Sequence, residues 1–291
     1  MTTLPCFAPA CVWDSACELG EGPVWDAGLG ALWFVDIKRR ELLAFGPGDA
    51  RTRWAAPDQP GFALPAADGG LVVGMPDGLH RFDPATGRFQ RLATVETDRP
   101  GNRLNDASVA PDGSLWFGSM DDGEAAPTGA LYSWREGGLA CHDDGVAITN
   151  GPAMSPDSRT FYHTETLART VFAFDHAGGA LRNKRALIVI EKGAGWPDGT
   201  TVDAEGCLWV CLWGGWSARR YAPTGELLAN VRFPVANITK MAFGGPDLRT
   251  AYATTAAKGL GTAERTAQPL AGGLFAWSAD VPGLSQARAQ L

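Results

Sequence analysis

The chain has 291 residues, enough for one large domain or two modest ones with a core that needs no disulfide support. Its 25 lysines and arginines against 32 aspartates and glutamates leave a net charge of −7, so we expect neither nucleic acid nor a membrane surface as a partner. No run approaches about 18 apolar residues, and the first residues carry no signal-peptide pattern, so we expect a cytoplasmic chain.

Along the chain, a turn rich in proline, aspartate and glycine is repeatedly followed by a short run of aromatic and aliphatic residues. In chain order these runs predict strands at 31–34, 71–73, 115–117, 160–162, 207–210 and 250–252. Their matching residues stand at intervals of 39, 44, 45, 48 and 42, and are Trp33, Val72, Trp116, Phe161, Trp209 and Ala251. Such a period is typical of a β-propeller blade of four short strands.

Six copies of the repeat predict an all-β, six-bladed β-propeller that occupies residues 1–291 as a single domain. We expect residues 1–10 to be a flexible N-terminus and residues 280–291 to be a C-terminal tail. Cys11–Asp14 is a spare strand ahead of the first repeat, and we expect it to pair with the last blade near Leu274–Trp277 and close the ring. Two separate β-sandwiches are the weaker interpretation, because the period runs on without a linker.

Polar residues recur at one phase of this repeat, in the turn before each inner strand. Eleven residues before a matching residue stand Asn105, Asn150, Asp198 and Lys240, and Glu21 stands twelve before the first. Equivalent phases of a propeller lie at equivalent heights, so these side chains should converge on one mouth of the central channel. Glycine follows three of them, although each such turn is ordinary on its own.

Two carboxylates and an amide oxygen in this ring form an all-oxygen ligand set. Such a set suits one divalent cation in the channel, favouring Ca²⁺, Mg²⁺ or Mn²⁺ and tolerating Fe²⁺. No histidine or cysteine joins the ring, which argues against a structural zinc site. Zn²⁺ stays among the candidate ions for an open catalytic site, because three protein ligands leave room for water and substrate.

Six short motifs follow one another in order: Leu19–Trp25, Arg103–Asp106, Gly118–Met120, Thr149–Pro152, Pro197–Gly199 and Phe243–Gly245. With them the chain resembles the SMP-30/gluconolactonase/regucalcin-like lactonases, and within that family the bacterial sugar-acid lactonases of the xylonolactonase or arabinonolactonase type. The resemblance implies a six-bladed propeller with one divalent metal, held by Glu21, Asn150 and Asp198. It also implies that Arg103 and Asn105 bind the lactone and that Asp198 doubles as the general base.

Two positions depart from the family pattern. Some members have a glutamate after the Gly-Thr-Met stretch that touches the substrate, and the resemblance carries this role to Asp122 in this chain. Lys240 differs from the small polar residues of animal members. Its phase places it near the channel mouth, where it binds a sugar hydroxyl or carboxylate, or else pairs with an acidic neighbour such as Asp106.

The sequence therefore predicts a metal-dependent hydrolase that opens a sugar-acid lactone, such as xylonolactone, arabinonolactone or gluconolactone, to the aldonic acid. Either Asp198 takes the proton of the attacking water, or hydroxide on the metal attacks and Asp198 is only a ligand. We expect a monomer, with Trp213, Trp216 and Phe62 as candidate walls for the sugar ring. The alternatives are a non-catalytic calcium-binding propeller and an aryl-ester or phosphotriester hydrolase on the same fold.

Overall fold

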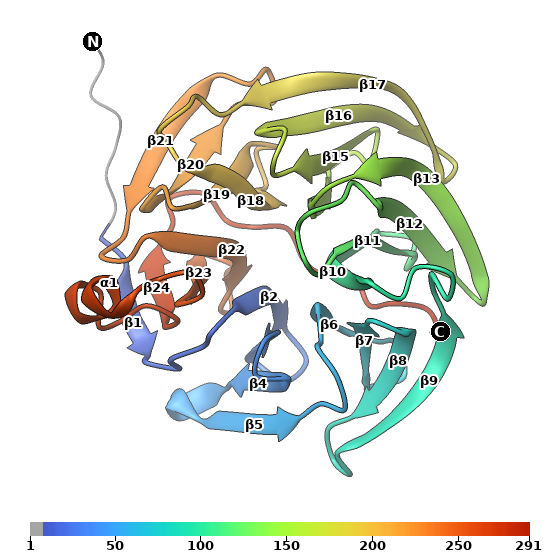
Figure 1. Ribbon diagram of the computed structural model, residues 1–291, viewed down its shortest axis with the longest axis horizontal. Coiled ribbons are helices and arrows are strands. Elements are labelled where there is room, and N and C mark those ends of the chain that lie inside the picture. Colours follow the sequence, from blue (N-terminus) through green and yellow to red (C-terminus); the bar gives the residue numbers. More distant parts are fainter. Residues whose placement is uncertain (1–7) are drawn as a thin grey trace.

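The structure, a computed structural model, describes residues 8–291 and consists almost entirely of antiparallel strands. Six four-stranded sheets are arranged as blades around a central axis (Figure 1). The prediction of an all-β, six-bladed propeller is therefore confirmed. In five blades the strand nearest the axis is the first in chain order. The last blade follows the same order in three of its strands, and its outermost strand comes from the start of the chain.

Within each blade the strands follow one another from the axis outward. Blades 1 and 2 contain β2 (Gly20–Asp26), β3 (Ala31–Asp36), β4 (Glu41–Phe45), β5 (Arg51–Ala55), β6 (Phe62–Pro65), β7 (Leu71–Met75), β8 (Gly78–Asp83) and β9 (Arg88–Thr94). Blades 3 and 4 contain β10 (Asn102–Val109), β11 (Leu115–Asp121), β12 (Gly129–Arg135), β13 (Gly138–Val146), β14 (Thr149–Met154), β15 (Thr160–Glu165), β16 (Thr170–Ala177) and β17 (Ala180–Val189). Blades 5 and 6 contain β18 (Trp196–Val202), β19 (Leu208–Trp213), β20 (Ser217–Tyr221), β21 (Leu227–Arg232), β22 (Asn237–Gly244), β23 (Thr250–Ala256), β24 (Leu274–Ser278) and β1 (Ala10–Trp13). Two short helical segments are the 3₁₀ turn Pro47–Asp49 and α1 (Thr262–Ala267).

The ring closes where the beginning of the chain joins the last blade. β1 pairs antiparallel with β24, so that Cys11 lies opposite Phe275. This pairing confirms the closing strand expected at Cys11–Asp14. Ala10, which the sequence assigned to a flexible N-terminus of residues 1–10, belongs to β1. Residues 1–7 lie outside the described residues.

The expected C-terminal tail, residues 280–291, is fastened to several blades and passes behind the inner strands in Figure 1. Gly283 forms a β-bridge with Asp203 of blade 5. The backbone N–H of Ala289 donates to the carbonyl of Pro65 in blade 2 (2.9 Å), and that of Gln290 to Gly113 in blade 3 (3.0 Å). The tail therefore spans the end of the channel from one side of the ring to the other.

Aromatic rings fill the space between neighbouring blades. The rings of Trp116 in β11 and Phe161 in β15 are 4.6 Å apart, and those of Trp209 in β19 and Trp277 in β24 are 6.3 Å apart. Three of these rings belong to the repeating residues that define the sequence period. Removing such a ring from water stabilises the fold by roughly 2–3 kcal/mol. The aromatic residues that recur in the sequence are therefore those that pack one blade against the next.

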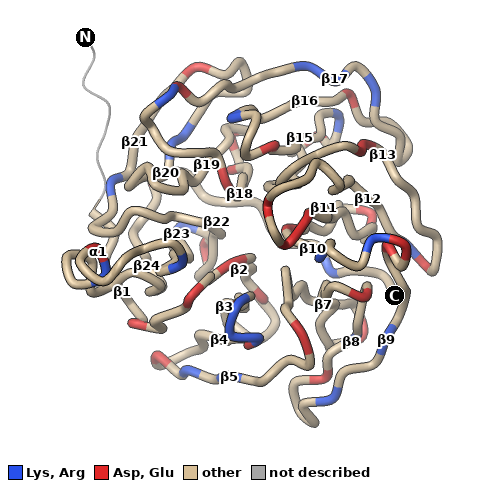
Figure 2. The backbone as a smooth tube through the Cα atoms, viewed as in Figure 1, with Lys and Arg blue, Asp and Glu red and all other residues tan. Residues whose placement is uncertain are grey.

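Charged residues are distributed over all six blades, and lysine and arginine positions occur as separate segments around the ring (Figure 2). The helix α1 lies at the rim of blade 6 with none of its residues buried. Within residues 8–291, no helix is long and apolar enough to cross a membrane.

One buried histidine has no part in the channel. His163 in β15 is almost fully buried, and neither of its ring nitrogens has a hydrogen-bond partner among the described residues. Burial lowers its pKa to about 4; the nearby Asp143 carboxylate opposes this shift and the Lys184 ammonium reinforces it. The fold therefore accommodates the neutral imidazole.

Replacing this histidine, as His163→Leu, should make the protein less sensitive to acid. A pKa of about 4 in the folded chain against 6.5 in the unfolded chain means that stability is lost as the pH falls from about 6.5 to 4. The loss amounts to about 3 kcal/mol. Urea unfolding measures the free energy of unfolding at pH 7 and at pH 4. Between these pH values, the wild-type protein should lose about 3 kcal/mol more of this free energy than the variant. Equal decreases in both proteins would contradict this assignment.

Candidate active site

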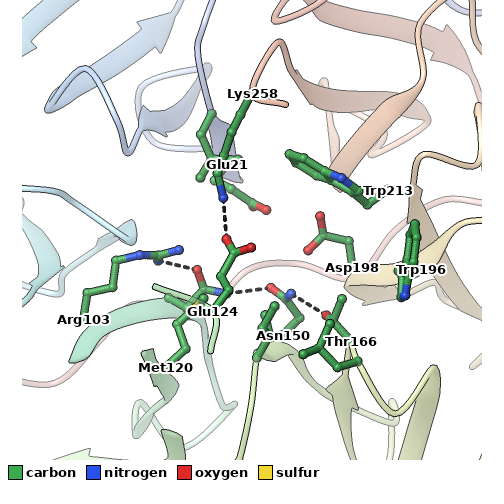
Figure 3. A pocket seen from close by; sticks show the side chains of 14 residues that line it. Glu21, Arg103, Met120, Glu124, Asn150, Thr166, Trp196, Asp198, Trp213 and Lys258 are labelled. Atoms are coloured by element: carbon green, nitrogen blue, oxygen red, sulfur yellow. Dashed lines mark hydrogen bonds and ion pairs between the residues drawn. The ribbon is translucent and has the colours of Figure 1, made fainter. Parts of the chain in front are cut away.

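One end of the central channel opens into a pocket of about 240 Å³. Glu21 of β2, Asn150 of β14 and Asp198 of β18 line this pocket (Figure 3). Asn105 of β10 is a further lining residue. Arg103 of β10 lines it as well, and all five side chains are buried. The inner strands of four blades thus bring together four of the five residues that share one phase of the repeat.

A β-bulge directs these side chains toward the axis. In five blades the pairing of the inner strand shifts at the same phase: between Glu21 and Val24, Leu104 and Ala107, Asn150 and Ala153, Pro197 and Thr200, and Ile238 and Met241. A bulge leaves a residue unpaired, bends the strand and changes where its side chains point. Gly22 and Gly151 stand inside two of these bulges with φ of 57° and 53°, a conformation that glycine adopts at little cost.

Glycine at this phase also lets neighbouring inner strands come close together. A Cβ added to Gly151 would lie 2.6 Å from the Cβ of Thr200 in the next blade. A Cβ added to Gly199 would lie 2.5 Å from the Cβ of Lys240 in the blade after that. These glycines follow Asn150 and Asp198, so they let the strands that carry both side chains converge on one pocket.

A chain of hydrogen bonds orients the amides of the pocket. Nη1 of Arg103 donates to Oδ1 of Asn105 (2.5 Å), and Nδ2 of Asn105 donates to Oδ1 of Asn150 (2.9 Å). Nδ2 of Asn150 then donates to the hydroxyl of Thr166 (2.9 Å). Oδ1 of Asn150 keeps a second lone pair, which is free to bind a cation.

Glu21 and Asp198 are buried carboxylates that line the same small pocket. Burial raises the pKa of Glu21 to about 8, and the charge of Asp106 adds to the shift. Burial, followed by the charge of Glu21, holds the pKa of Asp198 well above its usual range. Glu21 accepts a hydrogen bond from the backbone N–H of Gly22 (2.8 Å), whereas no described residue donates a hydrogen bond to Asp198. Two buried negative charges with so few hydrogen bonds are stable together only if a cation binds beside them or if they take up protons.

These donors fit a divalent cation that prefers oxygen ligands. The two carboxylates supply two negative charges, and the amide of Asn150 supplies a neutral oxygen. Across residues 8–291, no group of three or more histidine, cysteine, aspartate or glutamate side chains is placed to hold a metal. The mixed set of two carboxylates and one amide is therefore the candidate that the described chain offers.

Two predicted substrate-binding residues lie outside the lining of this pocket. Nζ of Lys240 donates to Oδ1 of Asp106 (2.5 Å), which is the second of the two roles that the sequence left open. Its side chain lines a second cavity of about 570 Å³, which residues 284–287 of the tail also line. Asp122 accepts a hydrogen bond from Nε of Arg103 (2.7 Å), so it orients the predicted ligand of the lactone. Direct contact of Lys240 or Asp122 with substrate stays a prediction.

Among the lining residues that the sequence did not single out, three are charged or aromatic. Glu124 follows β11, and its carboxylate forms an ion pair with the ammonium of Lys258, which follows β23 in blade 6 (Figure 3). Trp196 at the start of β18 is the third. Loop residues have no fixed phase within the repeat. The only signal for Glu124 is that it comes a few residues after the Gly118–Met120 motif, where some family members have a glutamate.

The three aromatic walls expected from the sequence have different locations. Trp213 lines the pocket, and the ammonium of Lys258 lies 5.9 Å from its ring centroid. Phe62 is fully buried in the core, with its ring 6.0 Å from that of Phe117. Trp216 is not part of the pocket lining. Among the described residues, Trp196 and Trp213 are thus the aromatic residues that line this pocket.

Fold and site together define a class: six-bladed β-propellers with buried carboxylates and amides at one end of the central channel. The chain belongs to the SMP-30/gluconolactonase/LRE-like family, whose model matches residues 19–257. The resemblance inferred from the six sequence motifs is therefore confirmed at the level of the family.

Relatives of known identity match nearly the whole chain. Regucalcin of Xenopus laevis is 32% identical over 276 residues, which cover 91% of this chain and 92% of that protein. Regucalcin of Oryctolagus cuniculus is 34% identical over the same length and coverage. A solved structure of the calcium-binding protein regucalcin from Agrobacterium tumefaciens is similar with a TM-score of 0.96, at 29% identity and full coverage of both chains.

The glycine after Asn150 should resist substitution. Gly151→Ala requires a positive φ and brings a Cβ against Thr200, so we expect it to lower the free energy of unfolding by about 3 kcal/mol. Gly48→Ala is the matched control: it also requires a positive φ (65°) but meets nothing within 4 Å, so its cost should be about 1 kcal/mol. Urea unfolding measures both, and equal losses would show that the close approach of blades 4 and 5 does not matter.

Proposed function

We propose that the protein is a metal-dependent lactonase that opens a sugar-acid lactone to the aldonic acid. The substrate class is a pentonolactone, such as xylonolactone or arabinonolactone, or gluconolactone. The observation that carries this proposal is the convergence of two buried carboxylates, an amide oxygen and a buried arginine in one small pocket. Membership of the SMP-30/gluconolactonase/LRE-like family supports the same kind of chemistry.

Glu21, Asn150 and Asp198 are the proposed metal ligands. A divalent cation bound there supplies Lewis acidity for the lactone carbonyl and lowers the pKa of a nearby water. Oxygen donors suit Ca²⁺, Mg²⁺ or Mn²⁺, with Fe²⁺ and Zn²⁺ as further candidates. Calcium has additional support, because the similar Agrobacterium tumefaciens structure is described as a calcium-binding protein.

Asp198 is the best-placed group to take the proton of the attacking water. Its carboxylate accepts no hydrogen bond from any described residue, whereas Glu21 accepts one from Gly22 and Glu124 is paired with Lys258. A strand bulge fixes its direction, which is more exact than a loop would allow. Substitutions at position 198 separate this role from the competing one, in which Asp198 serves only as a ligand.

Arg103 and Asn105 are the proposed substrate-binding residues, with Arg103 as the donor. Nδ2 of Asn105 already donates to the carbonyl of Thr149 and to Asn150, so its Oδ1 would accept from a sugar hydroxyl. Nε and Nη1 of Arg103 are used within the protein, but no described residue accepts from Nη2, so its two N–H groups can bind lactone oxygens. Trp213 and Trp196 offer flat apolar walls for a sugar ring. Such donors suit a polyol better than the apolar substrate of an aryl-ester or phosphotriester hydrolase.

The pocket has room for a single sugar ring rather than for an oligosaccharide. We keep a monomer as the proposed oligomeric state, because the ring closes within one chain. A non-catalytic calcium-binding propeller is the second candidate, favoured by the description of the Agrobacterium tumefaciens relative. The two candidates differ in turnover: only the lactonase releases acid from a lactone.

Removing the carboxylate at position 198 should abolish turnover. Asp198→Ala should lose metal binding and activity together, whereas Asp198→Asn keeps an oxygen ligand but has no base. If Asp198 is the base, the asparagine variant retains bound metal and loses activity by about a thousandfold or more. A pH-indicator assay on pentono-, hexono- and aryl-lactones, with and without chelator, measures turnover, and metal analysis measures binding.

The control for this pair is Asp157→Ala, which removes an exposed carboxylate that does not line the pocket. It should leave activity and metal content unchanged. If Asp198→Ala keeps both its activity and its metal content, the assignment of Asp198 as metal ligand and base is wrong. If the metal-loaded wild-type protein hydrolyses none of the sugar lactones, the result would instead favour a non-catalytic calcium-binding protein.

Weakening the arginine fork should affect substrate binding but not metal binding. Arg103→Lys keeps a positive charge and loses the planar arrangement of donors, so we expect KM to rise by about tenfold or more while metal affinity stays within about twofold. Arg185→Lys, in an exposed ion pair with Asp175, is the control and should change neither quantity. Steady-state kinetics and calorimetric metal titration test this, and an equal loss of metal affinity would place Arg103 in the metal site instead.

A further inference from the structure

A buried ion pair inside the channel has no part in the proposed reaction. Nζ of Lys240 in β22 donates to Oδ1 of Asp106 in β10 (2.5 Å) and to the carbonyl of Ala107 (3.1 Å). The two residues are 6% and 2% exposed, and they join blades 6 and 3 from opposite sides of the ring. Removing two charges from water costs several kcal/mol per ion, so such a pair is not expected by default.

The pair touches the backbone next to two of the three proposed metal ligands. Oδ2 of Asp106 accepts a hydrogen bond from the N–H of Gly151 (2.7 Å), and Gly151 follows Asn150. The aliphatic stem of Lys240 packs against Gly199, which follows Asp198; a Cβ there would lie 2.5 Å from the stem. One lysine therefore braces the strands that carry Asn150 and Asp198.

The residue before Lys240 reaches the third proposed ligand. The hydroxyl of Thr239 donates to the carbonyl of Gly20 (2.6 Å), directly before Glu21. The charges of Asp106 and Lys240 also act on Glu21 itself: beside burial, Asp106 raises its pKa and Lys240 lowers it. The ion pair is thus mechanically and electrostatically connected to the whole ligand set.

The net charge of the buried carboxylates and Lys240 in the channel suits one divalent cation. Glu21, Asp198 and Asp106 are three buried carboxylates, and the ammonium of Lys240 neutralises one of them. This count covers the three inner carboxylates and Lys240; Arg103 adds a positive charge near Glu21 and shares the Asp122 carboxylate with Lys38. Two negative charges remain, which is the charge that one divalent cation cancels.

We propose that Lys240 is a positioning residue which acts through Asp106: its ammonium is a built-in cation that sets the net charge of the metal site and holds the ligand strands in place. This inference rests on the proposed metal site. It departs from the role of Lys240 as a substrate ligand, because the ammonium is bound to Asp106 and the side chain lines the second cavity rather than the substrate pocket. Lys240 therefore acts on the ion and not on the lactone.

Opposite effects of two substitutions test this role. Lys240→Met leaves an unpaired carboxylate beside the site, so Ca²⁺ should bind about tenfold more tightly and Tb³⁺ should gain more than Ca²⁺. Asp106→Asn leaves an unpaired ammonium, so Ca²⁺ should bind about tenfold more weakly. The double variant Lys240→Met/Asp106→Asn should return to within about threefold of the wild-type affinity. Calorimetry with Ca²⁺, Tb³⁺ luminescence and the metal-induced shift in Tm are the measurements.

Lys184→Met is the matched control, because it breaks an ion pair with Asp143 outside the channel and should leave metal affinity unchanged. If Lys240 served only for packing, both single variants would weaken Ca²⁺ binding and the double variant would be no better; that result overturns the inference. If Lys240→Met does not fold, recovery of affinity in the double variant relative to Asp106→Asn still supports the inference, and failure to recover overturns it. Absence of metal binding by the wild-type protein would overturn the proposed function as well, so the two failures are distinguishable.

Discussion

The site depends on the closure of the ring. Glu21 stands on the first blade, Asn150 on the fourth and Asp198 on the fifth, and they share a pocket only because the sixth blade returns to the first. Closure places β1, from the start of the chain, on β24 near its end. Further bonds cross the seam beside this pairing: the backbone N–H of Cys17 donates to the carbonyl of Gly272 (2.9 Å), and Thr239 donates to Gly20 immediately before Glu21. The same contacts that remove a free sheet edge therefore set the position of one proposed metal ligand.

Closure also creates an electrostatic strain at the axis. Inner strands that converge bring their side chains together away from water, and two of those side chains are carboxylates whose pKa values burial raises. Without a cation, these carboxylates either take up protons or repel one another as like charges. Functional sites commonly store such unfavourable energy, which the surrounding packing compensates. In this protein the aromatic contacts between blades and the fastened C-terminal tail supply that packing, and an ion in the pocket would remove the repulsion.

The sequence predicted those parts of the molecule that repeat. The recurring aromatic strand predicted six blades, and residues at one phase of it predicted that Glu21, Asn105, Asn150 and Asp198 share a pocket, because a strand bulge recurs at that phase in their blades. Lys240 shares both the phase and the bulge, yet its long side chain extends to Asp106 instead of the pocket. Phase fixes where a side chain begins but not where a flexible one ends. Glu124 and Lys258 could not be predicted in this way, since they belong to loops whose lengths differ from blade to blade.

Strands and loops divide the work in this pocket. Arg103 shows how firmly a strand residue is held: Asp122 accepts from its Nε, and Lys38 and Gln59 in turn donate to Asp122. Burial alone would raise the pKa of Asp122, but those hydrogen bonds and the Arg103 guanidinium hold it well below its usual range, so the carboxylate stays charged. Glu124 and Lys258, by contrast, are partly exposed and pair only across the pocket. Groups that need exact placement are thus on inner strands, whereas this ion pair in the pocket lining is on loops, which can change in sequence without disturbing the ring.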